Sequence, residues 1–131
     1  MKAPRRLTVE QDQDQPPLDI ETLRAAASRL LAEDAEAPTP EELETLTVQL
    51  RGHIGQLVPE VEQAAGRLPY DDIPRYCALA CVGEARHKVD LSLKLDLKRS
   101  GLDAGVAHAR RLSRVVNALC DHLENLGGGH A

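Results

Sequence analysis

The sequence predicts an all-α protein, a small helical bundle of about four segments with a disordered N-terminal arm. Apolar residues recur at steps of three and four along four stretches, the period of helices that bury one face. The 131 residues include two Tyr, no Phe and no Trp, whereas aromatic residues are enriched in strands. A core of Leu, Val, Ile and Ala lets helix backbones approach closely, which favours a bundle.

The chain divides into three parts. Residues 1–17 form the disordered arm, because they are rich in Gln and Asp and end in two prolines, a composition that buries little apolar surface. Residues 18–126 form the helical bundle domain, since a chain of this length fills one core. Residues 127–131 form a flexible tail that begins with three glycines, which end the last helix.

The starts of the first two helices carry clear capping signals. Asp19 is a good N-cap for a first helix that runs to about Glu33. Thr39 caps the second helix, Pro40 suits its first position and Glu42 completes a capping box. Pro59 lies inside the second helix, where a proline removes one backbone hydrogen bond and crowds the carbonyl four residues earlier. We therefore expect a kink there.

The third helix is followed by a stretch with a different pattern. Asp72 can cap this helix, and an apolar face then recurs at helical spacing: Cys77, Ala78, Cys81, Val82, Ala85 and Val89. In residues 91–97, leucines alternate with polar residues. On a strand these leucines would share one face, whereas on a helix they would scatter round the axis. A lone strand could pair only with another copy of the chain, so a helix that continues or frays is favoured.

The last helix has the most regular pattern, a coiled-coil-like seam with steps of three and four residues. The seam comprises Leu102, Gly105, Ala109, Leu112, Val116, Leu119, Leu123 and Leu126. Arg110, Arg111 and Arg114 lie on the opposite side. Because the seam is continuous and the chain has little core to spare, we expect a homodimer. Another protein is the alternative partner.

Charge and hydropathy limit the partners and the location. The net charge is −5, with an acidic half in residues 1–72 and a basic half in residues 73–131. The halves complement each other within the bundle or across a dimer; alternatively, the basic half offers a surface to an anionic partner. Nucleic acid is not expected, because the chain is acidic and lacks Phe and Trp for base stacking. No secretory signal and no membrane-spanning stretch are recognisable, so we expect no membrane contact and a cytoplasmic protein with reduced cysteines.

Several short phrases match a known family in the same order. They are Arg51-Gly52-His53, Leu57-Val58-Pro59-Glu60-Val61-Glu62, Ala78-Leu79-Ala80-Cys81-Val82-Gly83-Glu84-Ala85 and Ala118-Leu119-Cys120-Asp121-His122. Over residues 18–126 the chain resembles a family of small actinobacterial proteins of unknown function, labelled natural product biosynthesis protein. The resemblance implies an accessory role in such a pathway and assigns no catalytic or ligand-binding residue.

Five titratable residues are the candidates for binding a polar ligand. His53 and Glu60 lie on one edge of the second helix, on either side of Pro59, and Asp121 and His122 lie near the end of the last helix. Glu84, on the third helix, completes the set. A histidine beside a carboxylate can bind a polar ligand or act as general acid and base. The alternative is a set of solvated residues at the edge of the core.

Two patterns suggest a metal, but each has a simpler interpretation. Glu84 and His87 form one copy of the Glu-x-x-His unit that di-metal bundles use twice, and Glu84 is also placed to pair with Lys88 one turn on. The cysteines Cys77, Cys81 and Cys120 could join His53 or His122 at a zinc ion, but they lack the Cys-x2-Cys spacing of structural zinc sites. Cysteine is often a small core residue. We therefore expect no metal and no cofactor.

These features favour an accessory or regulatory interaction protein. The alternative is a small helical enzyme or ligand-binding protein with a polar site near His53, Glu60 and Glu84. A pocket with convergent titratable groups would favour the enzyme, whereas an exposed apolar patch would favour the interaction protein.

Overall fold

The computed structural model describes residues 18–127, so the predicted arm (1–17) and residues 128–131 of the predicted tail lie outside the described residues. The described part is all-α, as predicted, with four long helices and one short one. They are α2 (Ile20–Leu31), α3 (Pro40–Gly66), α4 (Ile73–Lys94), α5 (Leu97–Ser100) and α6 (Leu102–Asn125). No helix within residues 18–127 is both long enough and apolar enough to cross a membrane.

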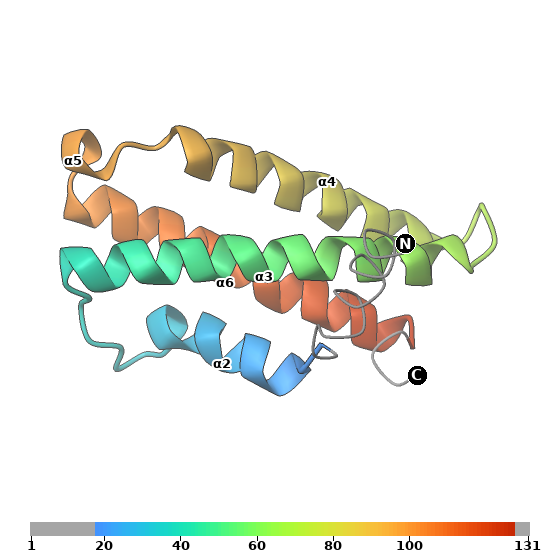
Figure 1. Ribbon diagram of the computed structural model, residues 1–131. Coiled ribbons are helices and arrows are strands. Elements are labelled where there is room, and N and C mark those ends of the chain that lie inside the picture. The colour runs from blue at the N-terminus through green and yellow to red at the C-terminus, as the bar shows by residue number, and fades with distance from the viewer. Residues whose placement is uncertain (1–17, 128–131) are drawn as a thin grey trace, which may run out of the picture.

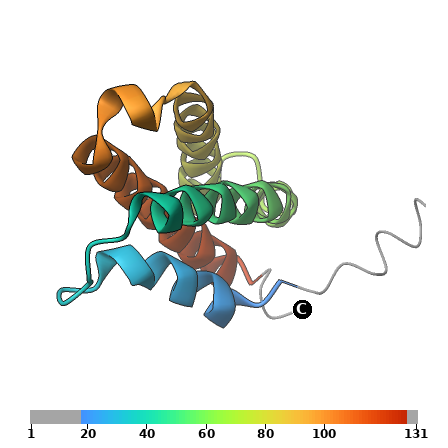
Figure 2. The same ribbon diagram turned by 60° about the vertical axis from the view of Figure 1, so that its left-hand side comes forward.

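The long helices alternate in direction along the chain, and α6 is the central one. Figures 1 and 2 show α2 and α4 on opposite sides of the pair formed by α3 and α6. Helix α6 contacts α2, α3, α4 and α5, whereas α2 lies mainly against α6. Helix α4 packs on α3 and α6 and buries only four of its 22 residues. Much of the surface of α4 therefore faces outward.

The predicted helix caps are present. Asp19, Thr39 and Asp72 each accept a hydrogen bond from the backbone N–H three residues on, at 3.4, 3.1 and 3.2 Å. Each bond satisfies one of the free N–H groups of a helix start. The predicted capping box is not completed, because within residues 18–127 the Glu42 carboxylate accepts no hydrogen bond from the Thr39 N–H. It pairs instead with Arg29 of α2 at 3.1 Å, so it ties α2 to α3 across the connecting loop.

The core consists of aliphatic side chains, as the composition predicts, and α6 contributes most of its predicted seam to it. Leu112, Val116 and Leu119 are fully buried, whereas Leu102, at the first turn of α6, is 39% exposed. The central seam residues therefore pack inside the chain and leave no continuous apolar stripe for a second copy. The homodimer remains a prediction, but it needs another surface.

Three local expectations have different outcomes. Helix α3 continues through Pro59 as one helix, and Figure 1 shows no sharp bend there. Pro59 lies on the exposed side of the helix, as does Gly55, the residue four positions earlier whose carbonyl the ring crowds. The stretch 91–97 is helical on both sides of a break at Leu95 and Asp96, in accordance with the favoured alternative.

Cys77 was expected on the apolar face of α4 but is exposed. The reason is that α3 and α6 cover only the narrow face of α4 that carries Ala78, Val82 and Ala85.

Candidate functional site

The five predicted ligand-binding residues do not form one cluster. Glu84 pairs with Lys88 on α4 at 3.0 Å, as the simpler interpretation predicts. Asp121 of α6 pairs with Arg24 of α2 at 2.7 Å. Since α2 and α4 lie on opposite sides of the α3–α6 pair, these two carboxylates belong to separate ion pairs, one within α4 and one between α2 and α6.

Among the three remaining candidates, His53, Glu60 and His122, the structure shows no hydrogen-bonded pair of a histidine and a carboxylate within residues 18–127. His53 is half-buried on α3, and burial lowers its pKa. Its Nδ1 atom is buried and has no hydrogen-bond partner among the described residues. Glu60 is exposed two turns further along α3, and His122 is half-buried near the end of α6. Burial therefore favours the neutral form of the His53 ring, and no carboxylate within residues 18–127 bonds to it as acid–base chemistry would require.

All three cysteines are free thiols, and two of them, Cys81 and Cys120, lie in environments that disfavour the thiolate. Burial raises the pKa of Cys120 to about 11. The pKa of Cys81 is also raised, by burial and then by the charge of Glu84. Within residues 18–127, no three His, Cys, Asp or Glu side chains are grouped so that they could hold a metal ion. A zinc site would need the thiolate form, so these two cysteines fit the role of small core residues.

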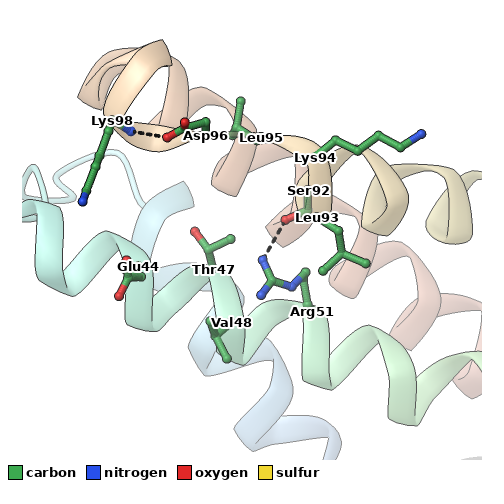
Figure 3. A pocket seen from close by; sticks show the side chains of 10 residues that line it. All are labelled: Glu44, Thr47, Val48, Arg51, Ser92, Leu93, Lys94, Leu95, Asp96 and Lys98. Carbon is green, nitrogen blue, oxygen red and sulfur yellow. Dashed lines mark hydrogen bonds between the residues drawn. The ribbon is translucent and has the colours of Figure 1, made fainter.

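An open cavity lies where the start of α3 faces the end of α4 and the short α5 (Figure 3). Its volume of about 660 Å³ is within the range of sites for small organic ligands. The lining residues are Glu44, Thr47, Val48, Arg51, Ser92, Leu93, Lys94, Leu95, Asp96 and Lys98. Because α4 ends at Lys94 and α5 turns away over the start of α6, the end of the α3–α4 contact stays open.

Arg51 and Ser92 form the polar centre of this cavity. The guanidinium Nη1 donates a hydrogen bond to Ser92 Oγ at 3.1 Å. Ser92 is buried and 5% exposed, while Arg51 is half-buried. Thr47, on the same wall, is also buried and donates its hydroxyl to the carbonyl of Leu43 at 2.8 Å. The site thus presents hydrogen-bond donors from α3 and a hydroxyl from α4.

Positively charged side chains near the Arg51–Ser92 hydrogen bond also affect the pKa of His108 on α6. Its pKa is lowered by burial first, and then by Arg111, Lys88 and Arg51. Its Nε2 atom is buried and has no hydrogen-bond partner in the described part of the chain. Where α3, α4 and α6 meet, burial and three positively charged side chains therefore disfavour the charged form of a buried histidine.

The sequence did not predict this site, because its residues form no recognisable motif along the chain. Arg51 interrupts the apolar run of α3 directly after Leu50, and Ser92 is one of the polar residues between the leucines of the 91–97 stretch. These two residues are 41 positions apart. A polar residue at the edge of an apolar helix face is the one signal that the sequence offers.

A second feature is an exposed apolar surface at the start of α4, which we call the tyrosine patch. It consists of Tyr70, Ile73 and Tyr76, whose exposed fractions are 89%, 73% and 74%. Both tyrosines of the chain belong to it. The Arg75 guanidinium lies over the Tyr70 ring, with its central carbon 5.5 Å from the ring centroid, and so orients that side chain.

Comparison with known proteins identifies a family but no characterised relative. No curated protein and no solved structure matches the chain. The model of one family, described as "Family of unknown function (DUF6415)", matches residues 21–128, a span that covers the five described helices except Ile20, the first residue of α2. The chain therefore belongs to this family of unknown function, DUF6415.

Proposed function

We propose that the protein is a non-catalytic interaction module with an accessory or regulatory role, and that it self-associates through the tyrosine patch. The observation that carries the proposal is the position of the aromatic residues. The chain has two, and both are largely exposed beside Ile73. Tyrosines are enriched at the centres of protein interfaces, where they combine a large apolar area with a polar tip.

The charges around the tyrosine patch favour a second copy as its partner. The charged residues next to the patch in the sequence are two arginines and two aspartates, Arg67, Asp71, Asp72 and Arg75, so this segment is balanced although the whole chain has a net charge of −5. In a two-fold dimer the same surface contacts itself. A balanced patch avoids the like-charge repulsion that an acidic surface would meet in such a contact, and its arginines can face the aspartates of the other copy.

Helix α4 offers further contact area next to the patch. Cys77 and Ala80 are exposed on the same part of the helix, one and two turns after Ile73. Their small side chains let the backbone of a partner helix approach closely. Leu79, 37% exposed, adds apolar area.

The biological setting is inferred from two observations. The resemblance to proteins labelled natural product biosynthesis supports an accessory place in such a pathway. The three free cysteines support a reducing compartment, the cytoplasm. The alternative, an enzyme with a site at His53, Glu60 and Glu84, has little support, because these side chains do not converge.

Light scattering after size-exclusion chromatography tests self-association. At micromolar concentration, wild-type protein is expected at twice the chain mass of 14.3 kDa. Tyr76→Asp places a charge at the centre of the patch and should give the single-chain mass. Leu91→Asp is the matched control, because it changes an exposed apolar residue near the other end of α4, and it should remain dimeric. A wild-type mass of 14.3 kDa, or an unaltered mass for Tyr76→Asp, would refute the proposal.

A further inference from the structure

We propose that the cavity between α3, α4 and α5 binds a small organic anion, a carboxylate with an aliphatic body, and that Arg51 binds the carboxylate group. This function is independent of self-association, since the tyrosine patch lies at the other end of α4. Four features of the cavity support it: unused donors, a cation without a partner, the positions of the acidic residues, and apolar walls of sufficient size.

The polar groups at the centre of the cavity are donors with capacity to spare. A guanidinium carries five N–H donors, and Arg51 uses one of them, on Ser92 Oγ. Ser92 accepts this bond, while its own hydroxyl donates to no acceptor within residues 18–127. Because the spare capacity is that of donors, the ligand that complements it must supply acceptors. A carboxylate offers two oxygens in the geometry that suits a guanidinium fork.

Arg51 also lacks the counter-charge that three other arginines have at their helix contacts. Arg24, Arg29 and Arg86 each pair with a carboxylate of another helix. In the described part of the chain, no carboxylate lies within the 4.0 Å ion-pair distance of Arg51. Withdrawing a cation from water without a counter-charge is unfavourable. An anion in the cavity would provide the missing charge.

The acidic residues of the lining do not replace that anion. Asp96 accepts the backbone N–H of Lys98 at 3.0 Å and so belongs to the turn before α5. Figure 3 shows Glu44 toward the α5 end of the cavity, below the Lys98 side chain, and Arg51 toward the α4 end. The Lys94 side chain extends away from Arg51. Of the lining cations, Arg51 is therefore the one beside Ser92, whereas the Lys98 side chain extends from α5 toward α3 on the side of the cavity that carries Glu44.

The apolar residues of the cavity wall suit a ligand with an aliphatic part and not an inorganic ion alone. Val48, Leu93 and Leu95 line the same cavity, and Figure 3 shows the Leu93 side chain beside the Arg51 guanidinium. Val48 and Leu93 are 54% and 65% exposed, so a ligand chain that covers them removes apolar surface from water. A volume of about 660 Å³ holds an aliphatic body together with its carboxylate.

Isothermal titration with hexanoate tests the proposal on the full chain. Wild-type protein should give a saturable heat, and Arg51→Gln should bind hexanoate about tenfold more weakly or worse, since a charge-assisted hydrogen bond is lost. Arg86→Gln is the matched control, because Arg86 pairs with Glu62 at 2.7 Å and does not line this cavity. Its affinity for hexanoate should equal that of the wild type.

Two further probes and one further variant test separately the contributions of the charge and of the aliphatic body to binding. Hexan-1-ol has the aliphatic body without the charge, and inorganic phosphate has charge without the body; both should bind more weakly than hexanoate. Arg51→Lys keeps the charge without the fork and should bind with intermediate affinity, which also covers the case that Arg51→Gln fails to fold. Absence of saturable hexanoate binding, equal affinity of Arg51→Gln and wild type, or equal affinity for either smaller probe would overturn the proposal.

Discussion

Truncation of Leu119 tests where the core of this bundle lies. Leu119 is fully buried in α6, the helix that contacts all the others. Leu119→Ala removes apolar contacts and leaves a cavity inside the core cluster of buried side chains. Since α6 is held by contacts with α2, α3 and α4, the site can collapse only in part. We therefore expect a loss of about 3–5 kcal/mol in the free energy of unfolding, in the upper part of the usual range for this change.

That loss is large compared with the whole stability of a small domain, which is about 5–15 kcal/mol. For a domain of this size, each kcal/mol corresponds to about 4 °C, so the melting temperature should fall by more than about 10 °C. Circular dichroism at 222 nm reports it, because the fold is helical. Variants must be compared at one protein concentration, since the melting point of a self-associating chain depends on it.

Two controls make the measurement decisive. Leu102→Ala is the same substitution in the same helix, at a position that is 39% exposed, and should have a much smaller effect. Arg114→Ala alters an exposed residue of α6 and should change stability by less than about 0.5 kcal/mol. Equal effects of Leu119→Ala and Leu102→Ala would mean that the buried face of α6 is misplaced. A large effect of Arg114→Ala alone would indicate that its surface is engaged by a partner.

Two further predictions concern backbone strain and protonation. Gly101, which precedes α6, has φ of 91°, so Gly101→Ala should lower the free energy of unfolding by about 1–3 kcal/mol in urea titrations; Gly52→Ala, in an exposed helical position with open space, should not lower it. Burial lowers the pKa of His108 and of His53 below the ordinary 6.5, so the unfolded chain takes up protons first as the pH falls. Stability should therefore be complete above pH 6.5 and decrease below it, with a smaller decrease in His108→Gln; a pH-independent stability would contradict this assignment.

The starts of three helices could be predicted because their capping signals are local. Asp19, Thr39 and Asp72 each bond to a backbone N–H three residues away, so the sequence contains both partners. The two residues of the predicted Glu84–Lys88 ion pair are likewise only four positions apart in the sequence. The buried faces of α3 and α6 followed from apolar periodicity, which depends on the helical repeat and not on the identity of the neighbouring helix.

The surfaces around the core could not be predicted in the same way. The α6 seam indicated an apolar face correctly, but sequence alone did not decide whether another helix of this chain or a second copy covers it. Exposure of Cys77 depends on how much of α4 its two neighbours cover. The outward position of both tyrosines depends on where the turn after α3 lies relative to the bundle.

The sequence by itself determined four long helices, the capped starts of three of them and an aliphatic core, because hydrogen bonds and periodicity act within a few residues. Only the tertiary structure decided that α6 is central, that Arg51 meets Ser92 across 41 residues, and that the five predicted polar residues stay apart. The physical reason is that a cavity forms where separate helices diverge. Its lining depends on helix lengths, directions and packing partners together, and no short stretch of the chain contains that information.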